Sequence, residues 1–147
     1  MKGQKFISKS AAQTKLLGIK LAKQLNGNEV IALVGNLGSG KTTFVKGLAK
    51  GLGVKDVITS PTFVLMKNYK AKHKTIKNFV HVDCYRIPGI ELTAIGLDDF
   101  LNQADTVVAI EWAEKLPKKF KPKLVLNFVN TKQPNTRLIK IKSPQDR

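Results

Sequence analysis

One stretch of eight residues, 35–42, restricts the folds open to this chain more than any other. It reads Gly-Asn-Leu-Gly-Ser-Gly-Lys-Thr and matches the pattern G-x-x-x-x-G-K-[ST] at every fixed position. The apolar run at residues 30–34 before it is typical of a buried strand, and residues 43–50 after it have helical character. Strand, loop and helix in this order form the context in which this pattern binds phosphate.

The residue types of this loop explain how it would bind phosphate. Its glycines let successive backbone N–H groups turn inward, and the following helix points the positive end of its dipole at the same place. We expect Lys41 to reach the β- and γ-phosphates of a nucleoside triphosphate and the Thr42 hydroxyl to help hold a magnesium ion. A glycine-rich turn that binds nothing would need neither side chain. The other expected nucleotide contacts are Asn36, Leu37, Gly38, Ser39, Gly40 and Thr43.

The length and composition of the chain favour one compact unit. With 147 residues, 42% of them hydrophobic, the chain is long enough for one core and short for two, so we expect a single domain over residues 1–147. Cys84 is the only cysteine, which excludes an intrachain disulfide. No apolar run approaches the roughly 20 residues that cross a bilayer, and the first residues show no signal-type stretch. We therefore expect a cytoplasmic protein.

The charge of the chain is strongly positive. Lysine and arginine number 26 against 10 acidic residues, which gives a formal net charge of +16. Lysines concentrate in residues 67–77 and 115–123, where they can form basic patches that attract polyanions. Three interpretations stay open: direct contact with RNA, contact with an acidic partner protein, or a generally lysine-rich surface.

The hydrophobic pattern predicts an α/β fold. A helix capped by Ser10 is expected over residues 10–25, before the first strand. Residues 63–69 and 79–84 resemble the arms of an antiparallel hairpin with its tip at 71–78. The other expected elements are two short helices and three strands, at residues 91–95, 98–102, 107–110, 124–129 and 138–141. Together these elements predict a three-layer α/β P-loop NTPase fold with a mixed, mostly parallel sheet.

Two carboxylates stand where predicted core strands end. Asp83 follows the run at residues 79–82, and Glu111 follows the run at 107–110. In an open sheet, the carboxyl ends of the strands border the ligand crevice. We expect Glu111 to act on the metal side, because its strand is more uniformly apolar and therefore central, and Asp83 to orient water or contact the metal through water. The alternative for each is an ordinary strand-end carboxylate paired with lysine.

Three other polar residues have open interpretations. His81 lies two residues before Asp83, and is either hydrogen-bonded near the site or a structural histidine. Thr62 is either a sensor of the γ-phosphate or part of a rigid turn that enters a strand. Arg86, one of three arginines, either stabilises transition-state charge or clamps an acid of a partner.

The sequence also bears on the nucleotide and on the reaction. No N-K-x-D pattern follows the phosphate loop, so adenine is the expected base. An arginine-rich acceptor lid, which a small-molecule kinase would be expected to carry, is not evident. A kinase and a nucleotide-regulated RNA-binding module remain as alternative functions.

Four separated motifs together resemble one family. In chain order they are the phosphate loop with Thr43, then Ser60-Pro61-Thr62-Phe63, then His81-Val82-Asp83-Cys84-Tyr85-Arg86, and finally Ile110-Glu111-Trp112. Their order and spacing resemble the TsaE family, the small ATPases of bacterial tRNA threonylcarbamoyladenosine biosynthesis. The resemblance covers residues 10–114.

The resemblance implies a cytoplasmic, magnesium-dependent ATPase that works with the TsaB and TsaD proteins, which transfer a threonylcarbamoyl group to adenosine 37 of tRNA. It does not imply that this chain performs the transfer, and it leaves direct contact with tRNA open. By position, Thr42 and Glu111 resemble the family's magnesium ligands. Lys41 resembles its phosphate lysine, and Asp83 its acidic residue needed for hydrolysis.

Two further residues are assigned by this resemblance. Thr14 matches a threonine of the first helix that lies near the nucleotide in relatives, and Arg137, before the final strand, is expected to do likewise. The chain departs from the family at Asn36, where aspartate is common, at Ser39, where alanine is common, and at Ala113, which replaces a frequent proline.

Overall fold

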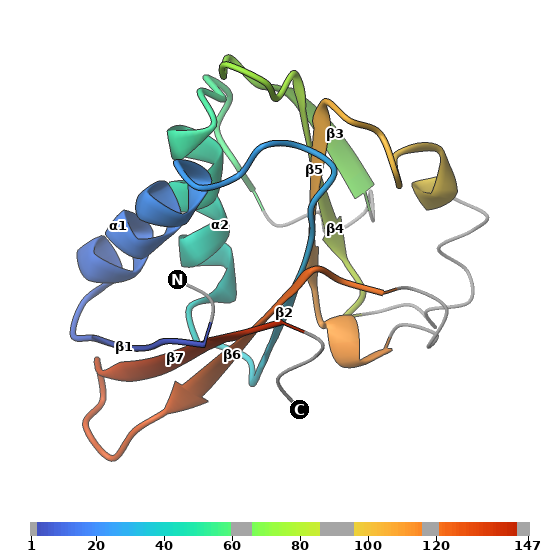
Figure 1. The fold of residues 1–147 in the computed structure, drawn as a ribbon. Coiled ribbons are helices and arrows are strands. Elements are labelled where there is room, and N and C mark those ends of the chain that lie inside the picture. Colours follow the sequence, from blue (N-terminus) through green and yellow to red (C-terminus); the bar gives the residue numbers. More distant parts are fainter. Residues whose placement is uncertain (1–2, 60–65, 86–95, 116–120, 144–147) are drawn as a thin grey trace.

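The computed structural model of the chain describes residues 3–59, 66–85, 96–115 and 121–143 (Figure 1). The expected elements at 63–65 and 91–95, and the candidates Thr62 and Arg86, lie outside these ranges. In chain order the elements are β1 (Lys5–Ser8), α1 (Ala11–Ala22), β2 (Val30–Gly35), α2 (Lys41–Gly51), β3 (Met66–Lys70), β4 (Asn78–Asp83), η2 (Leu97–Asp99), β5 (Thr106–Glu111), η3 (Ala113–Lys115), β6 (Leu124–Asn130) and β7 (Arg137–Lys142).

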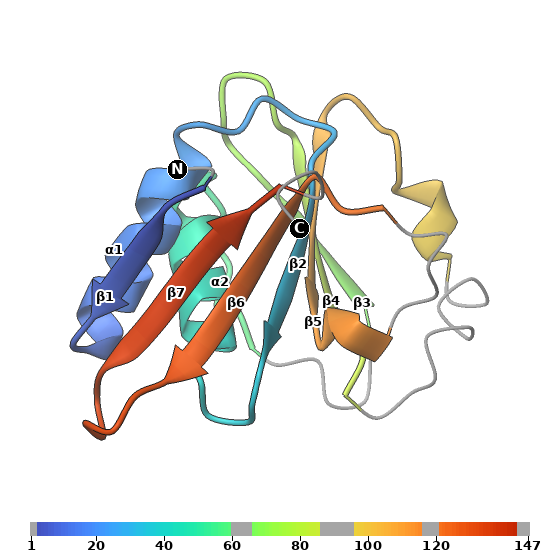
Figure 2. The ribbon, with the colours of Figure 1, turned by 60° about the horizontal axis from the view of Figure 1, so that its bottom comes forward.

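A single mixed sheet contains all the described strands, in the order β1-β7-β6-β2-β5-β4-β3 (Figure 2). Its centre is parallel, because β2 pairs in parallel with both β5 and β6, and β4 pairs in parallel with β5. The pairs at both edges are antiparallel. The predicted α/β fold with a mixed sheet is therefore confirmed, with the parallel pairing confined to the centre.

The two α-helices lie on one face of the sheet (Figure 1). That face buries a large apolar cluster to which α2 contributes Phe44, Val45 and Leu48. The opposite face buries a smaller cluster, where Leu97 of η2 packs with residues of β4 and β5. Between the two layers, all six residues of β5 are buried, as the apolar run at residues 107–110 predicts for its centre.

Helix α1 begins where the sequence predicts and ends earlier. The side chain of Ser10 accepts a hydrogen bond from the backbone N–H of Gln13 at 3.1 Å, which is the expected cap. The predicted end at residue 25 is wrong, because the backbone of residues 23–25 turns back onto carbonyls three residues earlier instead of continuing the α-helix. No helix in the described ranges is both long and apolar enough to span a membrane.

The hairpin of β3 and β4 is confirmed, with Tyr69 opposite Phe79 in its register. The helix expected at 98–102 is only the short 3-10 turn η2. Strand β1 was not predicted. It is four residues long and pairs only with β7. Its apolar Ile7 is exposed and its polar Ser8 is buried, so its sequence carries little periodic signal.

Candidate nucleotide-binding site

The phosphate loop joins the end of β2 to the start of α2 at the carboxyl edge of the sheet. Gly38 and Gly40 adopt φ angles of +75° and +100°, in the left-handed region that favours glycine. The outer loop residues Asn36 and Leu37 are exposed, whereas Ser39 is buried. The first N–H groups of an α-helix have no partner within the helix, so the start of α2 next to the loop suits a phosphate.

The side chain of Lys41 is turned into the loop. Its ammonium group donates hydrogen bonds to the carbonyl oxygens of Gly35 and of Asn36, the latter at 3.1 Å. It also lies 3.9 Å from the centre of the Trp112 ring, within the range of a cation–π interaction. Only 5% of Lys41 is exposed, so the loop and the indole hold its charge close to the first turn of α2.

Burial lowers the pKa of Lys41 below its ordinary value of 10.5. The nearby carboxylates of Glu111, Glu114 and Asp83 oppose this effect, because they favour the charged ammonium. The site therefore gathers one buried cation and several acids, an arrangement found where charged substrates bind.

Trp112 has an unusual backbone for a bulky residue, with a φ of +59°. The turn places its ring over Lys41 and 4.9 Å from the ring of Tyr85. Such backbone strain persists only where the surroundings hold it, and it concentrates at functional sites. Trp112 thus forms an aromatic wall beside the loop.

Thr42 and Glu111, which are far apart in sequence, meet at this edge. The Thr42 hydroxyl donates a hydrogen bond to Oε1 of Glu111 at 2.8 Å, and Glu111 is 2% exposed. The parallel register places Asp83 directly beside Glu111. One oxygen of the Asp83 carboxylate accepts a hydrogen bond from the backbone N–H of Tyr85 at 2.9 Å. This edge of the sheet therefore brings together three side chains whose oxygen atoms could bind a metal, near the start of α2.

The geometry of Thr42 and Glu111 fits magnesium. Adjacent ligands of an octahedron with bonds of about 2.1 Å lie about 3 Å apart, close to the 2.8 Å between these two oxygens. No group of three or more His, Cys, Asp and Glu side chains in the described ranges is arranged to hold a metal. Magnesium does not need such a group, because one or two protein ligands plus phosphates and waters are its usual set.

His81 also lies at this site. Its Nε2 is 2.5 Å from Oε2 of Glu111, and both side chains are buried. Of the two interpretations that the sequence left open, the structure supports a hydrogen bond to a site residue. The sequence alone gave no partner for this histidine.

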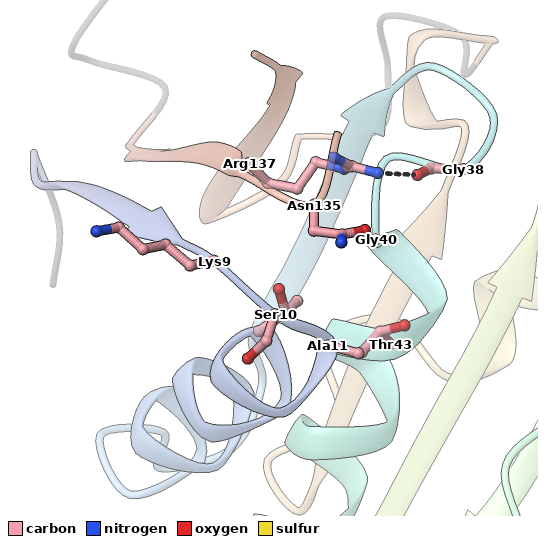
Figure 3. Close-up of a pocket in the computed structure, with 9 residues that line it drawn as sticks. Lys9, Ser10, Ala11, Gly38, Gly40, Thr43, Asn135 and Arg137 are labelled. Atoms are coloured by element: carbon pink, nitrogen blue, oxygen red, sulfur yellow. Dashed lines mark hydrogen bonds between the residues drawn. The ribbon is translucent and has the colours of Figure 1, made fainter. Parts of the chain in front are cut away.

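A pocket of about 340 Å³ adjoins the phosphate loop on the side of α1 (Figure 3). Figure 3 shows Arg137 and Asn135 reaching toward the loop from the β7 side, with Ser10 and Ala11 at the start of α1 facing them. Its volume lies within the range of small-molecule sites. The lining residues are Lys9, Ser10, Ala11, Thr14, Gly38, Gly40, Thr43, Asn135 and Arg137.

Thr14 and Arg137, which the resemblance assigns to the nucleotide, both line the pocket beside the loop. The Thr14 hydroxyl is buried and shares a hydrogen bond of 2.7 Å with the hydroxyl of Ser8. Nη2 of Arg137 donates to the carbonyl oxygen of Gly38 at 3.1 Å, which ties β7 to the loop. The roles of both residues toward a nucleotide remain predictions.

Sequence reasoning gave no role to Trp112, Ser10 or Asn135 at this site. Trp112 directly follows Glu111, a candidate metal ligand, and this position in the sequence could have indicated that Trp112 lies at the site. Ser10 was expected only as a helix cap, and Asn135 lies in a polar turn with no signal of its own.

Comparison with known proteins identifies the family. Residues 8–139 match the family described as threonylcarbamoyl adenosine biosynthesis protein TsaE. The chain belongs to the TsaE family. This confirms the resemblance carried by the four motifs.

Individual relatives agree with this TsaE assignment. A tRNA threonylcarbamoyladenosine biosynthesis protein TsaE from Nostoc is 38% identical over 118 residues, covering 78% of this chain and 70% of the relative. The protein of the same name from Aquifex aeolicus is 38% identical over 114 residues, covering 76% and 78%. The crystal structure of Bacillus subtilis YdiB superposes with a TM-score of 0.73 at 26% identity, over 97% of this chain and 87% of that one.

Proposed function

We propose that this TsaE-family chain is the ATP-hydrolysing component of the tRNA threonylcarbamoyladenosine machinery and acts in the cytoplasm with the TsaB and TsaD proteins. The observation that carries the proposal is the meeting of Lys41, Thr42 and Glu111 at the start of α2, with the Thr42 and Glu111 oxygens 2.8 Å apart. Family membership connects this site to the tRNA modification.

In this proposal the phosphate loop and the neighbouring pocket bind the nucleotide. The loop N–H groups and Lys41 bind the β- and γ-phosphates, and the nucleoside enters the 340 Å³ pocket between α1 and β7. Arg137, which already bonds the loop, and Asn135 border the nucleoside end. Adenine is the proposed base, because the sequence lacks the guanine-specific N-K-x-D pattern.

Thr42 and Glu111 hold a magnesium ion in this proposal. When bound, magnesium neutralises the negative charge that develops on the phosphates during phosphoryl transfer. The hydrogen bond from the Thr42 hydroxyl to Glu111 supports this assignment, because the distance between the two oxygen atoms fits two adjacent ligands of one magnesium ion.

The reaction is hydrolysis of the terminal phosphoanhydride. A water oxygen forms a bond to the γ-phosphorus as the bond to the bridging oxygen breaks, which yields ADP, phosphate and a proton. Asp83 lies beside Glu111 and accepts a hydrogen bond from that water, which orients its attack. Lys41 neutralises charge on the phosphates. Catalysis is thus positioning and charge neutralisation, and partner proteins complete it.

The test is ATP hydrolysis measured with this protein alone, then with TsaB and TsaD, and then with tRNA added. We expect slow release of phosphate by the isolated protein and a rise with the two partners. Glu111→Gln should abolish the rise while nucleotide binding without magnesium is kept. Transfer of phosphate to an acceptor molecule instead of water would contradict hydrolysis and indicate a kinase. Equal rates of hydrolysis with and without TsaB and TsaD would contradict their role as partners.

A further inference from the structure

The carboxylate of Glu111 is held by two different donors, one on each oxygen. Oε1 accepts the Thr42 hydroxyl at 2.8 Å, and Oε2 lies 2.5 Å from Nε2 of His81. The side chains of His81 and Glu111 are 0% and 3% exposed, so water does not compete for this contact. The contact with Thr42 belongs to the proposed metal site, whereas the contact with His81 has no part in the function described so far.

The position of His81 on β4 makes this contact possible. Side chains two residues apart point to the same face of a strand, so His81 shares its face with Asp83. Its neighbour in the parallel register is Ala109, whose methyl group leaves room for the imidazole ring to reach Glu111, two residues further along β5.

The second ring nitrogen indicates where the hydrogen of the imidazole lies. Nδ1 of His81 is buried and has no hydrogen-bond partner among the described residues. A hydrogen on Nδ1 would be a buried donor without an acceptor, which is more costly than a bare lone pair. The hydrogen therefore belongs on Nε2, where Glu111 accepts it.

We propose that His81 is a positioning residue: its Nε2–H fixes the Glu111 carboxylate so that Oε1 faces Thr42. A glutamate carboxylate otherwise turns over a broad range about its last torsion, and that freedom would be lost on binding a metal. Hydrogen bonds to the ligands of a metal commonly change affinity or activity by about 10- to 100-fold. This inference rests on the proposed function only in taking Thr42 and Glu111 as magnesium ligands.

The first test measures the affinity for ADP by calorimetry, with magnesium and with chelator, in wild type, His81→Phe and His81→Gln. Phenylalanine fills the space without a donor, whereas the glutamine amide can replace Nε2–H. We expect the magnesium-dependent gain in affinity to fall by about 10- to 100-fold in His81→Phe and to be largely retained in His81→Gln. Affinity in chelator should be equal in all three. A gain that is unchanged in His81→Phe would overturn the proposal, as would an equal loss with and without magnesium, which is the result of a purely structural role.

The second test needs no nucleotide and no change at His81. The chain has two histidines, so nitrogen NMR of histidine-labelled protein gives two sets of signals, and His73→Gln assigns them. We expect His81 to be the Nε2–H form and its signals to move in Glu111→Gln. The Nδ1–H form in wild type, or no change in Glu111→Gln, would contradict the proposal even if His81→Phe fails to fold. If wild type shows no ADP binding at all, the proposed function fails, and the NMR result still decides the role of His81.

Discussion

The close contact of α1 with α2 supports both the fold and the pocket, and substitution of Gly47 tests it. The helices run in the same direction, and Gly47 of α2 faces the backbone of Lys15 in α1. A Cβ atom at Gly47 would lie 2.0 Å from the carbonyl oxygen of Lys15 and 2.8 Å from its carbonyl carbon. Because α1 carries Thr14 and α2 begins at the phosphate loop, the spacing of the helices sets the width of the pocket.

The magnitude follows from these distances. Ordinary contacts begin at about 3.4 Å, so Gly47→Ala has to move the helices apart by about 1.4 Å. Backbone atoms cannot rotate away, so the cost lies near the upper end of the 1–3 kcal/mol typical of overpacking. Alanine gains about 1 kcal/mol over glycine in helix propensity. We therefore expect a net loss of about 2 kcal/mol in the free energy of unfolding, or a fall in Tm of about 4–8 °C for a chain of this size.

Urea and thermal unfolding, followed by circular dichroism and by the fluorescence of the single tryptophan, measure this loss. Lys46→Ala is the matched control, because Lys46 precedes Gly47 in α2 and is exposed, and it should change stability by no more than about 0.5 kcal/mol. Affinity for ADP should fall in Gly47→Ala and not in the control. A Gly47→Ala variant as stable as wild type, or more stable, would show that propensity dominates and that the helices are not in close contact.

Three further predictions concern the site. Burial lowers the pKa of Lys41 in the folded protein below 10.5, its value in the unfolded chain. At pH values between these two pKa values the unfolded chain binds more protons than the folded protein. The free energy of unfolding of wild type should therefore rise with pH in this window, relative to that of Lys41→Met. Urea unfolding across that window measures this, and a flat or falling difference would contradict it. Arg137→Ala should weaken ADP binding by about 10-fold through loss of its bond to Gly38, whereas the exposed Lys132→Ala should not, as calorimetry can show. Glu111→Gln should lower the rate of magnesium-dependent hydrolysis at least about 100-fold, the size of effect typical when one group that stabilises transition-state charge is lost. A variant with the magnesium dependence of wild type would contradict the role of Glu111 as a metal ligand.

Much of the framework could be predicted because its signals are local. The phosphate loop combines fixed residue types with a strand before it and a helix after it, so its place at the start of α2 followed from sequence. The position of Glu111 at a strand end could be predicted because an apolar run ends there, and the full burial of β5 explains why that run is so uniform. The hairpin of β3 and β4 followed from alternation and a polar tip.

The rest depends on contacts between distant segments. The pocket joins Ser10, Gly40 and Asn135, which no sequence spacing connects. The partner of His81 depends on the register between β4 and β5, which fixes which side chains are neighbours and leaves no trace in either strand alone. Strand β1 is a short edge strand in which apolar Ile7 is exposed and polar Ser8 is buried, so its residue types do not show the alternation that marks a strand.

The most direct test of the site is a calorimetric titration of ATP with magnesium into the folded wild-type protein and into Lys41→Ala. We expect saturable binding of one nucleotide per chain in wild type and loss of this binding in Lys41→Ala. No binding to well-folded wild type, or the same affinity in the variant, would contradict the claim that residues 35–42 form a nucleotide site.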